Sequence, residues 1–211
     1  MKAIILAAGL GERLRPLTDT KPKCMVTLAG KTLLKRQINC LKKQGISKVL
    51  IVGGYLASKL ETYGSKVIIN SKFSQTNMVY SLFCAEKWMG DNEDIIISYG
   101  DIVYEDNVIL KLRNSKAPLV VTIDRQWQKL WSRRMTDPLS DAETLKLKDK
   151  NRIVEIGRKP NNYKDIEGQY IGLIKVRKDI VKEFCNVWHD LNLRHECKKM
   201  FMTEFIQHLL N

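Results

Sequence analysis

The sequence predicts an α/β fold built on a mostly parallel central sheet with helices on both faces. Short apolar runs typical of buried strands alternate with stretches in which apolar residues recur at helical spacing. The first apolar run, residues 2–8, leads directly into the glycine-containing turn at residues 9–13. Such alternation is typical of parallel strands joined by crossover helices, and ligands of these sheets bind beyond the carboxyl ends of the strands.

The elements expected before residue 125 follow this alternation. We expect strands at residues 2–8, 48–52, 66–70, 94–99 and 119–124, and helices at residues 32–44, 57–63, 77–89 and 106–114. Gly45 should end the helix at 32–44, because glycine readily adopts the left-handed conformation found after helix ends. The helix at 77–89 should be capped near Thr76 or Asn77.

The pattern becomes irregular after Asp124. Residues 125–141 are rich in Trp, Arg and Lys and show no clear periodicity. A hairpin is expected next, followed by one more strand and two helices. The ranges are 143–148 and 152–156 for the hairpin strands, 168–176 for the last strand, and 178–191 and 199–210 for the helices. With no repeat or low-complexity linker, we expect one domain over residues 1–211, with the irregular segment inserted toward the substrate.

The charge balance leaves several classes of partner open. The chain has 36 basic and 23 acidic residues and a net charge of +13, which suits a nucleic acid, a polyanionic small substrate or simply a basic surface. The basic residues are spread along the chain, with only short clusters such as Arg133-Arg134 and Lys198-Lys199. This spread disfavours a nucleic-acid partner.

The sequence also disfavours membrane-spanning proteins and disulfide-bonded proteins. We find no apolar run long enough to span a membrane and no signal-peptide layout. The five cysteines include no CxxC pair and are expected to be reduced thiols. The sequence therefore predicts a cytoplasmic protein without membrane association.

The turn after the first strand has the composition of a phosphate-binding loop. Gly9 and Gly11 carry no Cβ, so backbone N–H groups can approach a phosphate, and Arg13 and Lys23 add positive charge. A dinucleotide fingerprint is excluded because Leu14 occupies the position of its third glycine. A P-loop at residues 30–32 is excluded because residue 25 is Met where the motif needs Gly, so that segment reads as a turn and helix start.

Residues 6–13, with Pro22-Lys23 after them, resemble the nucleoside-triphosphate loop of the sugar-nucleotidyltransferase superfamily. Residues 76–82 resemble its phosphocholine cytidylyltransferase-like branch, and residues 70–79, 96–104, 138–146 and 202–205 are most similar to capsular phosphoglutamine cytidylyltransferases. The resemblance implies a Rossmann-like three-layer nucleotidyltransferase fold with a mostly parallel central sheet and a small β-hairpin insert. It also implies that CTP and a phosphorylated small molecule give a CDP-linked product and pyrophosphate, for capsule or surface polysaccharide modification.

The nucleotide site is expected at the strand ends. The residues expected to bind nucleotide are Leu6, Ala8, Gly9, Gly11, Arg13, Lys23, Gly54, Tyr55, Asn77 and Ser81. Asp101, a carboxylate directly after a strand and Gly100, is placed to hold Mg²⁺ that bridges phosphates, although a simple turn aspartate would look the same. The expected catalytic residues are Arg13, Lys23, Asp101 and Lys159.

The acceptor site is expected in the later part of the chain. Lys159 matches the superfamily's Glu-Lys-Pro element, whose lysine contacts the acceptor phosphate; by spacing alone it is a basic residue before a turn proline. Trp faces and carboxylates in the irregular segment could surround a cationic group, or the tryptophans could be core. The residues expected to bind the acceptor are Lys159, Arg125, Trp127, Trp131, Arg133 and Glu143.

One departure from the family pattern concerns the metal. Related enzymes continue to a Trp-x-Glu-Ile-Asp-like element that supplies a second metal ligand, and this sequence ends at Asn211 without it. Either this is a truncated form, or Glu204 or another acid substitutes for that ligand, or metal binding is weakened. Three rival functions stay open: a sugar-1-phosphate nucleotidyltransferase using another base, a basic nucleic-acid-binding protein, and a catalytically inactive relative. The acceptor and the oligomeric state, monomer or homodimer, are left undetermined.

Overall fold

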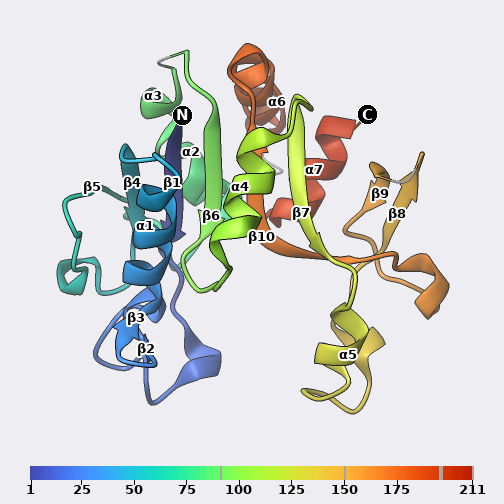
Figure 1. Ribbon diagram of the computed structural model, residues 1–211, viewed down its shortest axis with the longest axis horizontal. Coiled ribbons are helices and arrows are strands. Elements are labelled where there is room, and N and C mark those ends of the chain that lie inside the picture. Colours follow the sequence, from blue (N-terminus) through green and yellow to red (C-terminus); the bar gives the residue numbers. More distant parts are fainter. Residues whose placement is uncertain (91, 150, 195–196, 211) are drawn as a thin grey trace. The chain divides into compact units, whose positions relative to one another are not determined.

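The computed structural model describes residues 1–90, 92–149, 151–194 and 197–210 (Figure 1). The chain forms two compact units. The first unit comprises Met1–Val120 with Gly172–Met200, and the second comprises Val121–Ile171 with Phe201–Asn211. That residues 1–211 act as one domain stays a prediction. Among the described residues, each helix is too short or too polar to traverse a bilayer.

A six-stranded sheet with the order β5-β4-β1-β6-β10-β7 forms the centre of the fold. β1 pairs in parallel with β4 and β6, β4 pairs in parallel with β5, and β10 is antiparallel to β6. This confirms the predicted α/β class with a mostly parallel sheet. The strands are β1 (Lys2–Ala7), β4 (Val49–Gly53), β5 (Lys66–Ile69), β6 (Ile95–Tyr99), β7 (Leu119–Asp124) and β10 (Gln169–Val176).

The central strands are apolar over most of their length because both faces of the sheet are covered. Ala3, Ile4 and Ile5 of β1 are fully buried, as are Ile96 and Ile97 of β6. Continuous apolar runs of this kind are expected for parallel strands with helices on both sides. The predicted strands in this part of the chain are therefore confirmed to within one or two residues at their ends.

Helices cover the sheet within the first unit. Figure 1 shows α1 (Leu33–Lys43) and α4 (Asp106–Asn114) in front of the sheet and α2 (Met78–Phe83) behind it. The Thr32 hydroxyl accepts a hydrogen bond from the Lys35 amide and so caps the start of α1. Gly45, with a φ of 76°, follows the end of this helix as predicted. The later helix of this unit is α6 (Val181–Leu193).

Several local features differ from the sequence-based expectation. The short helix expected at 57–63 is only a 3-10 turn, Ala57–Lys59. The helix expected at 77–89 is divided into α2 and α3 (Glu86–Met89), because a tight turn intervenes in which the Ala85 amide donates to the Leu82 carbonyl. A small hairpin of β2 (Thr27–Leu28) and β3 (Lys31–Thr32) was not expected. It confirms that the segment around Gly30 is a turn and helix start.

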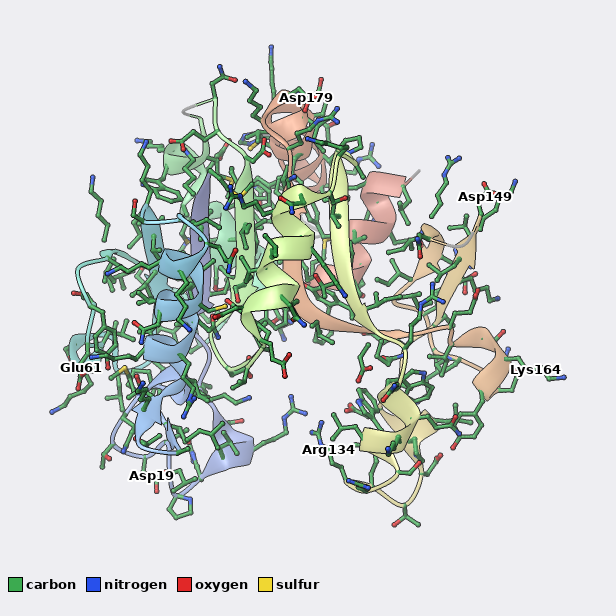
Figure 2. All side chains as sticks on the ribbon, in the orientation of Figure 1. Asp19, Glu61, Arg134, Asp149, Lys164 and Asp179 are labelled. Atoms are coloured by element: carbon green, nitrogen blue, oxygen red, sulfur yellow. The ribbon has the colours of Figure 1, made fainter. Side chains whose placement is uncertain are left out.

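The second unit contains the predicted hairpin, β8 (Leu145–Lys148) and β9 (Arg152–Ile156); Lys150, in its turn, lies outside the described residues. Helix α7 (Met202–Leu210) packs on β9, where the Ile156 amide donates to Gln207 Oε1 at 2.9 Å. The irregular segment also contains an unexpected short helix, α5 (Trp127–Trp131). Figure 2 shows the side chains of Arg134 and Lys164 extending outward from this unit.

Candidate active site

A cavity of about 460 Å³ lies at the carboxyl ends of β1 and β6, inside the first unit. This is the edge at which parallel sheets bind their ligands. Four segments of the sequence meet there: the turn after β1, the segment at Lys23-Cys24, residues 73–81, and the turn after β6. The residues that line the cavity are Leu6, Ala7, Ala8, Gly9, Leu10, Gly11, Glu12, Arg13, Lys23, Cys24, Phe73, Thr76, Asn77, Met78, Ser81, Tyr99, Gly100 and Asp101.

The two glycines of the first turn have different roles. Gly11 has a φ of 68°, in the left-handed region, and its carbonyl accepts a hydrogen bond from the Thr18 hydroxyl at 2.9 Å. A Cβ on Gly11 would lie 3.1 Å from Thr18 Cγ2 and 3.2 Å from Lys23 Cβ. A Cβ on Gly9 would meet nothing within 4 Å, so this backbone faces open cavity. Gly11 therefore shapes the turn, and Gly9 leaves room for a ligand.

The two positively charged side chains of the cavity, Arg13 and Lys23, differ in whether another side chain holds them in place. Arg13 lies in the 3-10 helix Glu12–Leu14, is exposed, and makes no hydrogen bond or ion pair within the described residues. Lys23, at the start of the 3-10 helix Lys23–Met25, donates to the carboxylate of Asp101. Each side chain of this pair is 31% exposed. One exposed and one anchored cation are thus available to a triphosphate.

Asp101 is held close to the end of β1. The Gly100 amide donates to the Leu6 carbonyl at 2.8 Å, and a Cβ on Gly100 would lie 2.9 Å from the same oxygen. Glycine at position 100 is therefore required for this close approach. Among the described residues no group of three or more His, Cys, Asp or Glu side chains is arranged to hold a metal.

Buried hydrogen bonds shape the loop that forms another wall of the cavity. Asn70, which is 1% exposed, donates to the hydroxyls of Thr76 and Ser81 at 3.0 Å each. Its Oδ1 accepts from the Lys72 amide at 2.9 Å. Asn70 therefore fixes the course of the loop that leads into α2, and Ser81 is one of the groups that it holds.

Asn77 caps α2 and ties the loop to a later segment. Its Oδ1 accepts from the Met78 amide, and its Nδ2 donates to the Lys199 carbonyl at 3.2 Å. The backbone N–H of Asn77 also donates to the Lys198 carbonyl at 2.8 Å. The predicted capping role is therefore confirmed. The side chain lines the cavity with its amide already engaged, so its predicted contact with a base stays a prediction.

Gly54 and Tyr55 do not line the cavity. They support the turn after β1 from behind, since the Tyr55 amide donates to the Ala8 carbonyl at 3.1 Å. A Cβ on Gly54 would lie 2.7 Å from that carbonyl oxygen and 2.6 Å from Phe73 Cβ. Phe73 lines the cavity and was not expected from the sequence. It is the one aromatic residue between the strand expected at 66–70 and the helix expected at 77–89.

Cys24 lines the cavity next to Lys23 but is a poor nucleophile. Burial raises the pKa of the Cys24 thiol to about 12, and the nearby charge of Asp101 acts in the same direction. The thiol is therefore protonated at neutral pH, and a thiol rather than a thiolate reacts slowly.

The second unit holds the residues expected to bind the acceptor. Lys159 Nζ donates to the carbonyls of Leu139 and Ser140, at 2.7 Å each. An ammonium group has three donors, so one remains for a further acceptor atom. Arg125 donates to Asn151 at 3.1 Å, and Arg133 is exposed.

The two tryptophans of α5 belong to a small aromatic cluster. Trp127 is 4% exposed, packs edge-on against Trp131 at 5.8 Å and stacks on Tyr163 at 6.1 Å. Ala142 and Ile166 complete this cluster. Of the two alternatives for Trp127, the structure therefore favours core packing, while Trp131 is partly exposed.

Acidic side chains also gather in the second unit. Burial, followed by the charges of Glu204 and Asp141, raises the pKa of Glu143, and the Thr203 hydroxyl opposes this. The carboxylate of Glu204 accepts a hydrogen bond from the Phe201 amide at 2.6 Å, at the start of α7. Asp101 and Glu204 belong to different units, so a metal site that they share stays a prediction.

Comparison with known proteins gives a family match. Residues 3–159 match the MobA-like NTP transferase domain. The chain is 43% identical to CTP:phosphoglutamine cytidylyltransferase of Campylobacter jejuni, in an alignment covering 100% of this chain and 88% of that protein. It is 40% identical to choline-phosphate cytidylyltransferase of Streptococcus pneumoniae, over 53% of this chain and 47% of that protein.

Solved structures share the fold. CTP:phosphocholine cytidylyltransferase from Streptococcus pneumoniae superposes with a TM-score of 0.70 at 22% identity, covering 98% of this chain and 83% of that one. The inositol-1-phosphate CTP transferase from T. maritima gives 0.72 at 24% identity, covering 98% and 79%.

Proposed function

This chain belongs to the MobA-like NTP transferase family, and we propose that it is a cytidylyltransferase that transfers CMP from CTP to phosphoglutamine. The observation that carries the proposal is the cavity where the Gly9 turn, Arg13, Lys23 and Asp101 meet. Backbone amides and two cations on one side suit a triphosphate. The full-length similarity to a phosphoglutamine enzyme supports the choice of acceptor.

The reaction follows from the groups that line the cavity. A phosphate oxygen of the acceptor attacks the α-phosphorus of CTP in line, and the bond from that phosphorus to the bridging oxygen of pyrophosphate breaks. No covalent intermediate with the protein is needed. The protein contributes positioning and charge compensation, which dominate catalysis of transfer at phosphorus. We assign Arg13 and Lys23 to the triphosphate and to the charge that grows on the leaving pyrophosphate.

The donor set at the turn after β6 suits Mg²⁺. Asp101 provides a hard carboxylate oxygen at the cavity wall, and Mg²⁺ is commonly held by one or two carboxylates, substrate phosphates and water. When bound, the ion would neutralise phosphate charge next to the reacting phosphorus. Lys23 pairs with Asp101 in the structure, so a metal ion held by Asp101 would compete with this pair and leave Lys23 available to the phosphates.

The second unit supports an acceptor with hydrogen-bonding groups. The remaining donor of Lys159 suits the acceptor phosphate, and the exposed Arg133 suits a carboxylate. Trp127 is 4% exposed, which leaves little of its aromatic surface for the quaternary ammonium group of phosphocholine. A role in capsule or surface polysaccharide synthesis and a cytoplasmic location remain part of the proposal.

The test is release of pyrophosphate by the purified chain from CTP, UTP, ATP and GTP, each with phosphoglutamine, phosphocholine or a hexose 1-phosphate. We expect CTP with phosphoglutamine to give the highest kcat/KM, and mass spectrometry to identify a CDP-linked product. The proposal would be overturned if the chain used a hexose 1-phosphate with another nucleotide and used neither phosphoglutamine nor phosphocholine. Tight oligonucleotide binding with a steep salt dependence and no CTP binding would favour a nucleic-acid partner instead.

A further inference from the structure

A buried glutamine of α1 lies against the turn that carries Asp101. Gln37 is 1% exposed and sits on the face of α1 that is otherwise aliphatic, beside Leu34, Ile38 and Leu41. A side-chain amide is costly to bury unless its donors and acceptor are satisfied. Packing alone would be served equally well by another aliphatic residue, so the amide requires a further explanation.

Every polar atom of this amide is used. Gln37 Nε2 donates to the carbonyl of Tyr99 at 2.9 Å and to the carbonyl of Ile102 at 2.8 Å. Gln37 Oε1 accepts from the hydroxyl of Ser98 at 3.0 Å, and Ser98 is fully buried. A carbonyl can only accept, so the Tyr99 and Ile102 carbonyls fix which way the amide is oriented, and both N–H donors are directed at the turn after β6.

The two carbonyls that Gln37 contacts stand on either side of Gly100-Asp101. The sheet itself holds the other side of this turn, through the hydrogen bond from the Gly100 amide to the Leu6 carbonyl. Asp101 is thus carried by a short bridge that is fixed to β1 and to α1. A catalytic group displaced by about 1 Å can lose roughly a hundredfold in rate, so such a bridge is a means of keeping the carboxylate in place.

We propose that Gln37 is a positioning residue for this site: its amide clamps the Tyr99 and Ile102 carbonyls and so fixes the Asp101 carboxylate relative to Lys23 and the triphosphate cavity. Gln37 does not itself touch the substrate, since it does not line the cavity. The metal-dependent part of this inference rests on the proposed function, whereas the effect on the turn does not.

The test compares Gln37→Met, which keeps the volume but removes all three hydrogen bonds, with Ile38→Ala, a neighbour on the same buried face. Hydrogen exchange of a peptide spanning residues 98–104 is measured in the nucleotide-free protein. We expect exchange to be about tenfold faster in Gln37→Met, while Ile38→Ala lowers the melting temperature without a selective change in this peptide. Unchanged exchange in Gln37→Met would overturn the clamp, whether or not the protein binds CTP.

The second readout is CTP affinity by calorimetry, with Mg²⁺ and with EDTA. We expect Gln37→Met to keep its affinity in EDTA and to lose about tenfold of the Mg²⁺-dependent gain, whereas Ile38→Ala keeps that gain. A full Mg²⁺-dependent gain in Gln37→Met would overturn the positioning role.

If the wild-type protein binds no CTP, the proposed function is contradicted. The hydrogen-exchange result alone then tests whether Gln37 holds the turn after β6. If Gln37→Met does not fold, Ser98→Ala provides a second comparison, because it removes the hydroxyl that donates to Gln37 Oε1 and leaves this buried oxygen without that donor. We then expect changes of the same sign and about threefold in size; their absence would likewise overturn the proposal.

Discussion

Replacing each glycine of the first turn by alanine should separate the shape of the turn from its ability to bind a ligand. Gly11 has a φ of 68°, and a Cβ there would lie 3.1 Å from Thr18 Cγ2. Left-handed backbone costs a non-glycine residue about 1–2 kcal/mol, before the close contact is counted. At about 2–4 °C per kcal/mol, Gly11→Ala should therefore lower the melting temperature by roughly 2–8 °C.

Gly9→Ala should behave in the opposite way. A Cβ at this position meets nothing within 4 Å, so the free energy of unfolding should stay within about 0.5 kcal/mol of wild type. The added methyl group would occupy space in the cavity where a phosphate approaches the backbone. We expect the Kd for CTP to rise by about tenfold or more, equivalent to about 1.4 kcal/mol.

Thermal melts of both variants with and without CTP provide the assay, since a ligand that binds only the folded state raises the melting temperature. The expected pattern is a stable Gly9→Ala protein that CTP barely stabilises, and a less stable Gly11→Ala protein. A Gly9→Ala variant that CTP stabilises as strongly as wild type would refute the assignment of this turn to the nucleotide. An unchanged melting temperature for Gly11→Ala would refute the strain argument.

Three further predictions concern charged side chains. Lys23→Ala should lower kcat by about 10²-fold with folding intact, while Lys21→Ala, which removes a nearby exposed lysine, should have little effect in steady-state assays. Lys159→Met should raise the KM for the acceptor and leave CTP affinity unchanged. The control is Lys164→Met, because Lys164 is also an exposed lysine of the second unit (Figure 2). An effect on CTP affinity alone would contradict the assignment of Lys159 to the acceptor. Burial raises the pKa of Glu143, so the folded state binds that proton more tightly than the unfolded chain and the charged form destabilises the fold. Glu143→Gln should therefore raise the melting temperature at pH 7–8, and this gain should disappear below about pH 4, as melts across pH would show.

Periodicity and local signals predicted most of the first unit. The sheet follows from short, fully apolar runs, and helix α1 from its apolar spacing between the Thr32 cap and Gly45. Boundaries failed where distant contacts decide them. The helix expected from residue 199 begins only at Met202, and the carbonyls of Lys198 and Lys199 accept hydrogen bonds from Asn77 instead.

The site could be predicted only in part. Spacing in the sequence shows which residues follow strands, but it does not show which partners their side chains contact. The Gly9 turn and Asp101 do meet at one cavity, as strand-end positions indicate. The pairing of Asp101 with Lys23 is a long-range contact that leaves no local signal. Gln37 was equally hidden, although a lone amide on an apolar helix face is a signal that could have been noticed.

The most direct test of the central claim is the Mg²⁺ dependence of pyrophosphate release from CTP and phosphoglutamine, measured for the wild-type chain and for Asp101→Asn. The cavity formed by the Gly9 turn, Lys23 and Asp101 predicts Mg²⁺-dependent turnover in the wild type. It also predicts a loss of about 10²-fold or more in Asp101→Asn, with the melting temperature little changed. Equal turnover by the two proteins, or no release from this pair of substrates at any Mg²⁺ concentration, would contradict it.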